Sequence, residues 1–104
     1  MRGVSERYEF EAPLWQWRAR DTQPGSWYFV SVPFDVADEI EATAGPGKGF
    51  GSVRVEVTAG ATTWRTSVFP SNEEETYVLP VKKPVRAAEG LDDGDTCHVV
   101  LRLV

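Results

Sequence analysis

The sequence predicts a mainly β fold with two short helices, arranged as a small mixed barrel built from two similar halves. Six segments carry the apolar and polar patterning of strands. The two stretches with helical spacing are too short and too few to cover both faces of a parallel sheet. The order strand, strand, helix, strand occurs twice, over residues 8–60 and 61–104. We therefore predict a barrel that is capped by a helix at each end.

Length and composition indicate a single domain over residues 7–104 after a flexible tail of residues 1–6. The 104 residues are 41% hydrophobic and carry a net charge of -5, which disfavours nucleic acid and anionic membranes as partners. One cysteine and one histidine exclude an internal disulfide framework and an ordinary zinc site, and we expect no cofactor. No apolar run is long enough to cross a membrane, so we expect a cytoplasmic location.

The first predicted strand lies within residues 7–20, where alternating apolar residues are interrupted by Pro13. Beyond the proline, the bulky residues Trp15 and Trp17 occupy the opposite phase. Proline within a sheet is confined to edge strands and bulges. The pattern therefore predicts an edge strand with a bulge, and the two tryptophans could expose an apolar surface.

The next elements of the first half follow from composition. Residues 27–32 are nearly all aromatic or β-branched, which predicts a strand buried on both faces and ended by Pro33. Asp35 is the predicted N-cap of a helix over residues 36–43. A glycine-rich loop covers residues 44–51.

The second half repeats this order. A tight turn at Gly60 and Ala61 predicts a hairpin between two strands, and Gly90 stops the second helix. The predicted elements are strands over residues 52–59, 62–69, 76–79 and 96–104 and a helix over residues 82–89. In the last strand, Cys97 shares its phase with Val99 and Leu101, which predicts a buried thiol, whereas His98 points the opposite way.

Several blocks, in order, carry a family resemblance across residues 8–104. They are Phe10-x-Ala12, Trp27–Val30 with Pro33 and Asp35–Ala37, Gly49–Val55, Trp64–Pro70, Tyr77–Lys82 with Val85 and Arg86, and Gly94-Asp95. In these blocks the chain resembles the DUF1905 family, a bacterial and archaeal group of domains of unknown function. The resemblance implies a double-split β-barrel, distantly similar to the swapped-hairpin DNA-binding barrels of the AbrB/MazE type. It implies no established activity.

One cluster of side chains suggests chemistry. Lys82, Lys83 and Arg86 lie in the first turns of the second helix, and Lys82 and Arg86, four residues apart, share one face. Cations there would suit a carboxylate, a phosphate or a partner's acidic side chain. Ser67 and Arg65 are further candidates for the same site. The alternative is that the acidic loop of residues 73–75, or water, neutralises the cations.

These features predict a non-catalytic binding module with a modest basic pocket for an anionic or other small ligand at the start of the second helix. Two other functions stay open. One is a DNA-binding regulator by analogy with AbrB-like barrels, and the other is a protein–protein interaction module. Catalysis is not expected, because Cys97 and His98 point to opposite faces and no metal set or cofactor loop accompanies them.

Overall fold

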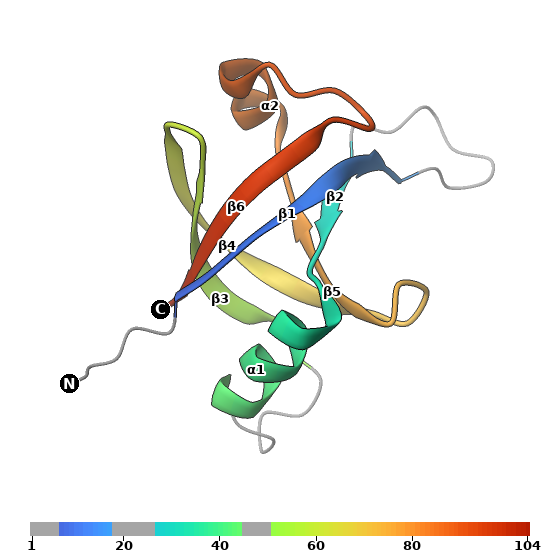
Figure 1. The fold of residues 1–104 in the computed structure, drawn as a ribbon, viewed down its shortest axis with the longest axis vertical. Coiled ribbons are helices and arrows are strands. Elements are labelled where there is room, and N and C mark those ends of the chain that lie inside the picture. The colour runs from blue at the N-terminus through green and yellow to red at the C-terminus, as the bar shows by residue number, and fades with distance from the viewer. Residues whose placement is uncertain (1–6, 18–26, 45–50) are drawn as a thin grey trace.

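The computed structural model describes residues 7–17, 27–44 and 51–104, which form six strands and two helices (Figure 1). In chain order these are β1 (Arg7–Gln16), β2 (Tyr28–Ser31), α1 (Phe34–Ala44), β3 (Val53–Ala59), β4 (Thr62–Ser71), β5 (Thr76–Pro80), α2 (Lys83–Glu89) and β6 (Thr96–Leu103). The predicted tail of residues 1–6 and residues 45–50 of the predicted glycine-rich loop lie outside the described residues.

The strands close into a barrel in the order β1-β2-β5-β4-β3-β6. Every recorded pairing is antiparallel, so the barrel is not mixed in strand direction. The two halves of the chain occupy equivalent places in this ring. Strands β1, β2 and β3 of the first half correspond to β4, β5 and β6 of the second, so the β1–β2 pair matches β4–β5 and the β3–β4 pair matches β6–β1. The predicted mainly β barrel of two strand–strand–helix–strand halves is thereby confirmed.

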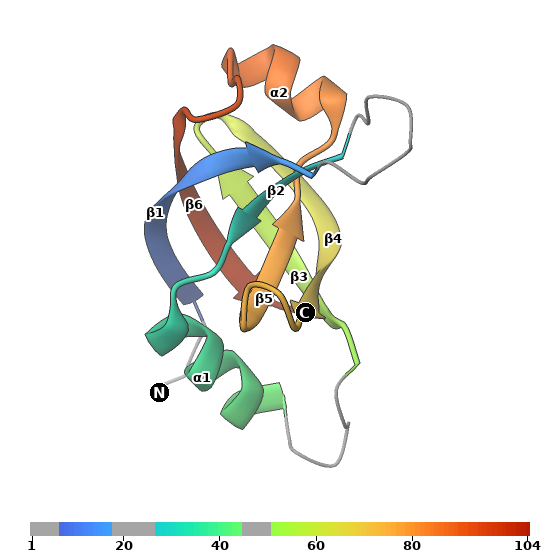
Figure 2. The same cartoon turned by 90° about the vertical axis from the view of Figure 1, so that its right-hand side faces the viewer.

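The two helices lie at opposite ends of the barrel (Figure 2). α1 buries Ala37 and Ile40 against the barrel, and α2 buries Val85. Neither helix is long and apolar enough to cross a membrane, within the residues that the structure describes.

Alternating side chains of all six strands fill the interior. The fully buried strand residues include Leu14, Val30, Val55, Val57, Val68, Leu79, Val99 and Leu101. Burial of each such side chain is worth about 1.5–3 kcal/mol. Cys97 lies in the same layer with 2% of its surface exposed, so the predicted burial of the thiol is confirmed.

The edge that Pro13 predicts is present in the first part of β1 only: in the recorded register, residues 7–13 pair with β6 alone, and β2 joins from Leu14 onward. The Leu14 N–H donates to the carbonyl of Asp95 (2.8 Å), and the Leu14 carbonyl accepts from Gly94 N–H (2.7 Å). Because successive N–H groups of a strand point to opposite sides, the Pro13 nitrogen faces away from β6. The proline therefore removes no hydrogen bond between β1 and β6.

Two predictions in the first half are wrong. The strand around β2 is not buried on both faces, because Val30 and Val32 point inward while Phe29 is half-buried and Trp27 is 56% exposed. Asp35 is not the residue before the helix, since α1 already begins at Phe34. Asp35 lies in the first turn, where its carboxylate accepts a hydrogen bond from Val36 N–H (2.9 Å).

The predicted hairpin between β3 and β4 is confirmed, and α2 is tied to it. Gly60 has a φ of 60°, in the left-handed region that glycine adopts without strain. The Glu89 carboxylate accepts hydrogen bonds from the Thr62 hydroxyl (2.6 Å) and from Ala61 N–H (3.3 Å). These contacts fix the end of α2 against the tip of the hairpin.

Candidate functional site

Lys82 and Arg86 lie together at the start of α2, where they border a hollow of about 320 Å³. This basic hollow is lined by Trp27, Tyr28, Pro80, Val81, Lys82, Lys83 and Arg86. Lys82 and Lys83 are exposed, and within the described residues neither forms an ion pair. The acidic loop of residues 73–75 therefore does not neutralise these two lysines by direct pairing.

Arg86 has a structural attachment as well as a charge. Its guanidinium carbon lies 3.8 Å from the centroid of the Tyr28 ring, and its Nε donates to the carbonyl of Val81 (3.2 Å). A cation over an aromatic face contributes about 0.5–2 kcal/mol. Arg86 thus holds α2 against β2, and the cations that are free of such contacts in the basic hollow are those of Lys82 and Lys83.

The structure does not bring Ser67 and Arg65 to this hollow. Both residues lie on β4, in the phase opposite to the buried Val68, and therefore point away from the core. Arg65 pairs with Glu56 across β3 (3.7 Å), and Ser67 lies opposite Arg54 in the strand register. Strand phase alone could have placed them on the outer face of the barrel, although not on which part of it.

A hollow rich in aromatic side chains lies on the outside of neighbouring strands β1, β2, β5 and β4. This aromatic groove has a volume of about 500 Å³ and is lined mainly by Trp15, Trp17, Trp27, Phe29, Phe69 and Pro80. Trp17 is 43% exposed, Trp27 56% and Phe69 44%. Three large apolar side chains so exposed around one hollow are typical of an interaction site.

Ring contacts and a polar relay hold the groove in shape. Phe29 lies between two tryptophans, with ring centroids 5.2 Å from Trp15 and 6.1 Å from Trp27. Trp15 Nε1 donates to the Ser31 hydroxyl (3.0 Å), which in turn donates to the Glu74 carboxylate (3.1 Å). The indole N–H of Trp15 is therefore already satisfied, and the wall that it forms is preorganised.

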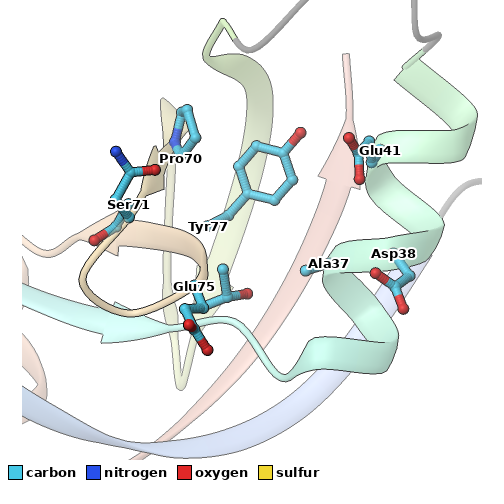
Figure 3. A pocket seen from close by; sticks show the side chains of 9 residues that line it. Ala37, Asp38, Glu41, Pro70, Ser71, Glu75 and Tyr77 are labelled. Atoms are coloured by element: carbon cyan, nitrogen blue, oxygen red, sulfur yellow. The ribbon is translucent and has the colours of Figure 1, made fainter.

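An acidic hollow of about 410 Å³ lies near α1 (Figure 3). Its carboxylates come from Asp38 and Glu41 on α1 and from Glu75 on the loop before β5, and Tyr77 points toward Glu41. Burial raises the pKa of Tyr77, and the Glu41 carboxylate raises it further. At neutral pH the hollow therefore presents a protonated phenol among carboxylates.

These three hollows are contiguous. The acidic hollow and the aromatic groove share Pro70 and Ser71, and the groove and the basic hollow share Trp27 and Pro80. The groove lies on the outer face of β5 with Val78 and Pro80, whereas Tyr77, in the phase of the buried Leu79, lines the acidic hollow on the other face, toward α1. We call the aromatic groove together with the basic hollow the aromatic track, because rings line most of it and cations lie at one end.

Two reactive side chains lie outside this track. Cys97 is buried, and burial raises the pKa of its thiol, with the Glu89 carboxylate adding to the rise. His98 points outward between Glu9 (2.5 Å) and Glu11 (3.8 Å) on the β1–β6 wall. Among the described residues no group of three histidine, cysteine, aspartate or glutamate side chains could hold a metal ion.

Comparison with models of protein families shows to which family this chain is related. Residues 10–101 match the model of the Domain of unknown function (DUF1905). The chain belongs to the DUF1905 family. The matched region includes the whole barrel wall that carries the aromatic groove, so the groove lies within the DUF1905 domain itself. Comparison with curated proteins gives no match.

The sequence of this DUF1905 domain predicts only part of the track. It indicates Trp15 and Trp17 as an exposed apolar surface, but it predicts a buried strand around Trp27 and does not distinguish Phe69 from its neighbours. The sequence does contain a signal for the exposure of Phe69. Because Val68 points into the core, its neighbour Phe69 points outward. Nothing in the sequence indicates that β4 and β2 flank β5, which is what places Phe69 and Trp27 on one groove.

Proposed function

We propose that this DUF1905 domain is a non-catalytic binding module whose ligand combines an apolar or ring-bearing part with an anionic group. The observation that carries the proposal is the contact between the aromatic groove and the basic hollow, which share Trp27 and Pro80. A ligand seated there covers exposed rings and reaches Lys82 and Lys83 at the same time.

Both parts of such a ligand gain free energy from the site. Covering exposed aromatic surface contributes about 25 cal/mol per Å² of apolar area, with a further gain where rings stack. The lysines have no ion-pair partner among the described residues, so an anion does not have to displace one. The chain's single histidine, His98, lies on the β1–β6 wall and lines neither hollow, which supports a binding role rather than acid–base chemistry. We propose a cytoplasmic setting for this module, supported by a lone, buried thiol.

The test uses 1-naphthyl phosphate as a probe, with inorganic phosphate and 1-naphthol as its two halves. We expect calorimetry to give tighter binding for the whole probe than for either half. Trp27→Ala and the double change Lys82→Gln with Lys83→Gln are each expected to weaken its binding at least fivefold. Phe34→Ala removes an aromatic side chain that is 64% exposed outside the groove, and Arg65→Gln removes a cation on another wall. Both control variants should bind the probe as the parent protein does.

Binding that is unchanged in the groove variants, or equally strong for inorganic phosphate alone, would refute the proposal. A mobility-shift assay with duplex DNA is the parallel measurement for the DNA-binding alternative. We expect no shift at 0.15 M salt, because the net charge of -5 and the acidic hollow oppose a polyanion.

A further inference from the structure

We infer that the ligand of the aromatic track is a free guanine nucleotide, with its base in the aromatic groove facing Glu73 and its phosphates at Lys82 and Lys83. This inference rests on the proposed function, since it uses the same groove and basic hollow, and it names the kind of ring and of anion. Its further support comes from Glu73, to which the proposed function gives no role.

Glu73 supplies the only charged side chain among the described residues that line the aromatic groove. It is exposed in the turn between β4 and β5, and it forms no hydrogen bond or ion pair with another described residue. Its neighbour Glu74 differs, because the Glu74 carboxylate already accepts from the Ser31 hydroxyl (3.1 Å). The Glu73 carboxylate is therefore available to a ligand in the groove, and a carboxylate accepts hydrogen bonds without donating any.

A carboxylate distinguishes the nucleobases by the donors on their edges. Guanine presents two adjacent donors, N1–H and the 2-amino group, which match the two oxygens of one carboxylate. Adenine and cytosine place an amino group beside a ring nitrogen that accepts, so this nitrogen would face a carboxylate oxygen with no proton between them. Hypoxanthine keeps N1–H but lacks the 2-amino group. Glu73 therefore favours guanine over hypoxanthine, and hypoxanthine over adenine.

The middle of the track suits a flat base. Trp27 is 56% exposed, and its ring is nearly parallel to that of Phe29, with an interplanar angle of 10°. A base that stacks on Trp27 adds to this pair of rings, and aromatic side chains bind bases in this way. Stacking alone accepts every base, so the choice of base falls to Glu73.

The two charged groups lie beyond opposite ends of β5. Glu73 precedes the first residue of this strand, and Lys82 and Lys83 follow its last. A strand of five residues extends about 13–16 Å. A nucleoside diphosphate suits this separation, because a ribose and a first phosphate lie between its base and its terminal phosphate. Its two phosphates also match the two lysines of the basic hollow.

The charge of the rest of the domain favours a free nucleotide over a nucleic acid strand. The net charge is -5, and the acidic hollow lies on the α1 side of β5. Further phosphates of a strand would be repelled by this field, whereas a diphosphate places its negative charges at the lysines alone.

The experiment compares the 5′-diphosphates of guanosine, inosine and adenosine, which differ only in the base. Quenching of tryptophan fluorescence, checked by calorimetry, measures their binding at about 0.05 M salt, where exposed charges are little screened. We expect guanosine diphosphate to bind at least fivefold tighter than inosine diphosphate and at least tenfold tighter than adenosine diphosphate. A single-stranded pentanucleotide with one central guanine should bind at least tenfold more weakly than guanosine diphosphate.

Variants show which side chain reads the base. Glu73→Gln should weaken guanosine diphosphate at least fivefold and bring the three nucleotides within about threefold of one another, because an amide offers one acceptor and one donor. Glu75→Gln is the matched control: Glu75 lies on the same turn but lines the acidic hollow, and its replacement should leave the order unchanged. Lys82→Gln with Lys83→Gln, and separately Trp27→Ala, should weaken all three at least fivefold and keep their order. Thermal melting of each variant verifies that it is folded.

Equal binding of the three diphosphates, or a preference for guanine that survives Glu73→Gln, would overturn the inference. Tighter binding of the pentanucleotide than of guanosine diphosphate would overturn the free nucleotide. If the nucleotides fail while 1-naphthyl phosphate still binds in a manner that depends on Trp27 and Lys82, the proposed function stands and only the guanine nucleotide is wrong. If neither binds, both proposals fall.

Discussion

Glu89 ties α2 to the β3–β4 hairpin, and its replacement by alanine should destabilise the whole domain. The carboxylate accepts from the Thr62 hydroxyl at 2.6 Å and from Ala61 N–H at 3.3 Å. Hydrogen bonds to a charged group contribute about 1.5–3 kcal/mol when they are well formed. The bond to Ala61 is long and exposed, so water replaces it at little cost. The stabilisation that Glu89 provides therefore comes mostly from its hydrogen bond with the Thr62 hydroxyl.

An opposing contribution lowers the net effect. Glu89 is the last residue of α2, where the helix dipole disfavours a negative charge by about 0.3–1 kcal/mol. Subtracting this gain, we expect Glu89→Ala to lower the free energy of unfolding by about 1–2 kcal/mol. For a domain of this size that corresponds to a decrease in Tm of roughly 4–8 °C. Glu39→Ala, at an exposed position of α1, is the matched control and should lie within about 0.5 kcal/mol of the parent protein.

Urea unfolding of a double-mutant cycle measures the pair directly. Thr62→Val removes the donor while keeping the shape of the side chain. We expect the double variant Glu89→Ala with Thr62→Val to be less destabilised than the sum of the single changes, by about 1 kcal/mol. Additive single changes, or a Glu89→Ala variant as stable as the Glu39→Ala control, would show that this contact does not hold α2 to the hairpin.

Three other predictions concern stability. Gly60→Ala should cost about 1–2 kcal/mol, measured by urea unfolding, because φ is 60° there and an added Cβ would meet the Glu89 carboxylate; part of the loss should disappear in a Glu89→Ala background. Leu14→Ala should cost about 2–5 kcal/mol and Trp17→Ala less than about 1 kcal/mol, because Leu14 is fully buried and Trp17 is 43% exposed; similar losses would mean that the two phases of β1 are wrongly assigned. Burial and Glu89 raise the pKa of Cys97 in the folded protein, so the unfolded chain loses its thiol proton first, and stability should fall as pH rises above about 8.5; a Cys97→Ala variant with an equally steep fall between pH 8.5 and 10 would contradict this.

The alternation of side chains was enough to predict most of the barrel's elements. Val55 and Val57 face inward as their phase requires, and Cys97 follows Val99 and Leu101 into the core. The reason is that successive side chains of a strand point to opposite faces, so a local pattern reports directly on burial. The turn at Gly60 and the repeated order of strands and helices are likewise local properties of the chain.

Which strands become neighbours is not a local property, and the candidate site depends on it. Closure of the ring brings β2 alongside β1 from Leu14 onward, so the edge that Pro13 predicts ends at the proline. Placement of β5 between β2 and β4 brings Trp27 and Phe69 to one groove, and the same ring places Arg65 with Glu56 rather than with Lys82. The alternation of apolar and polar residues indicates which side chains share a face of their own strand. It does not indicate which strands lie next to it. Those neighbours are set by long-range pairing, and only the tertiary structure shows them.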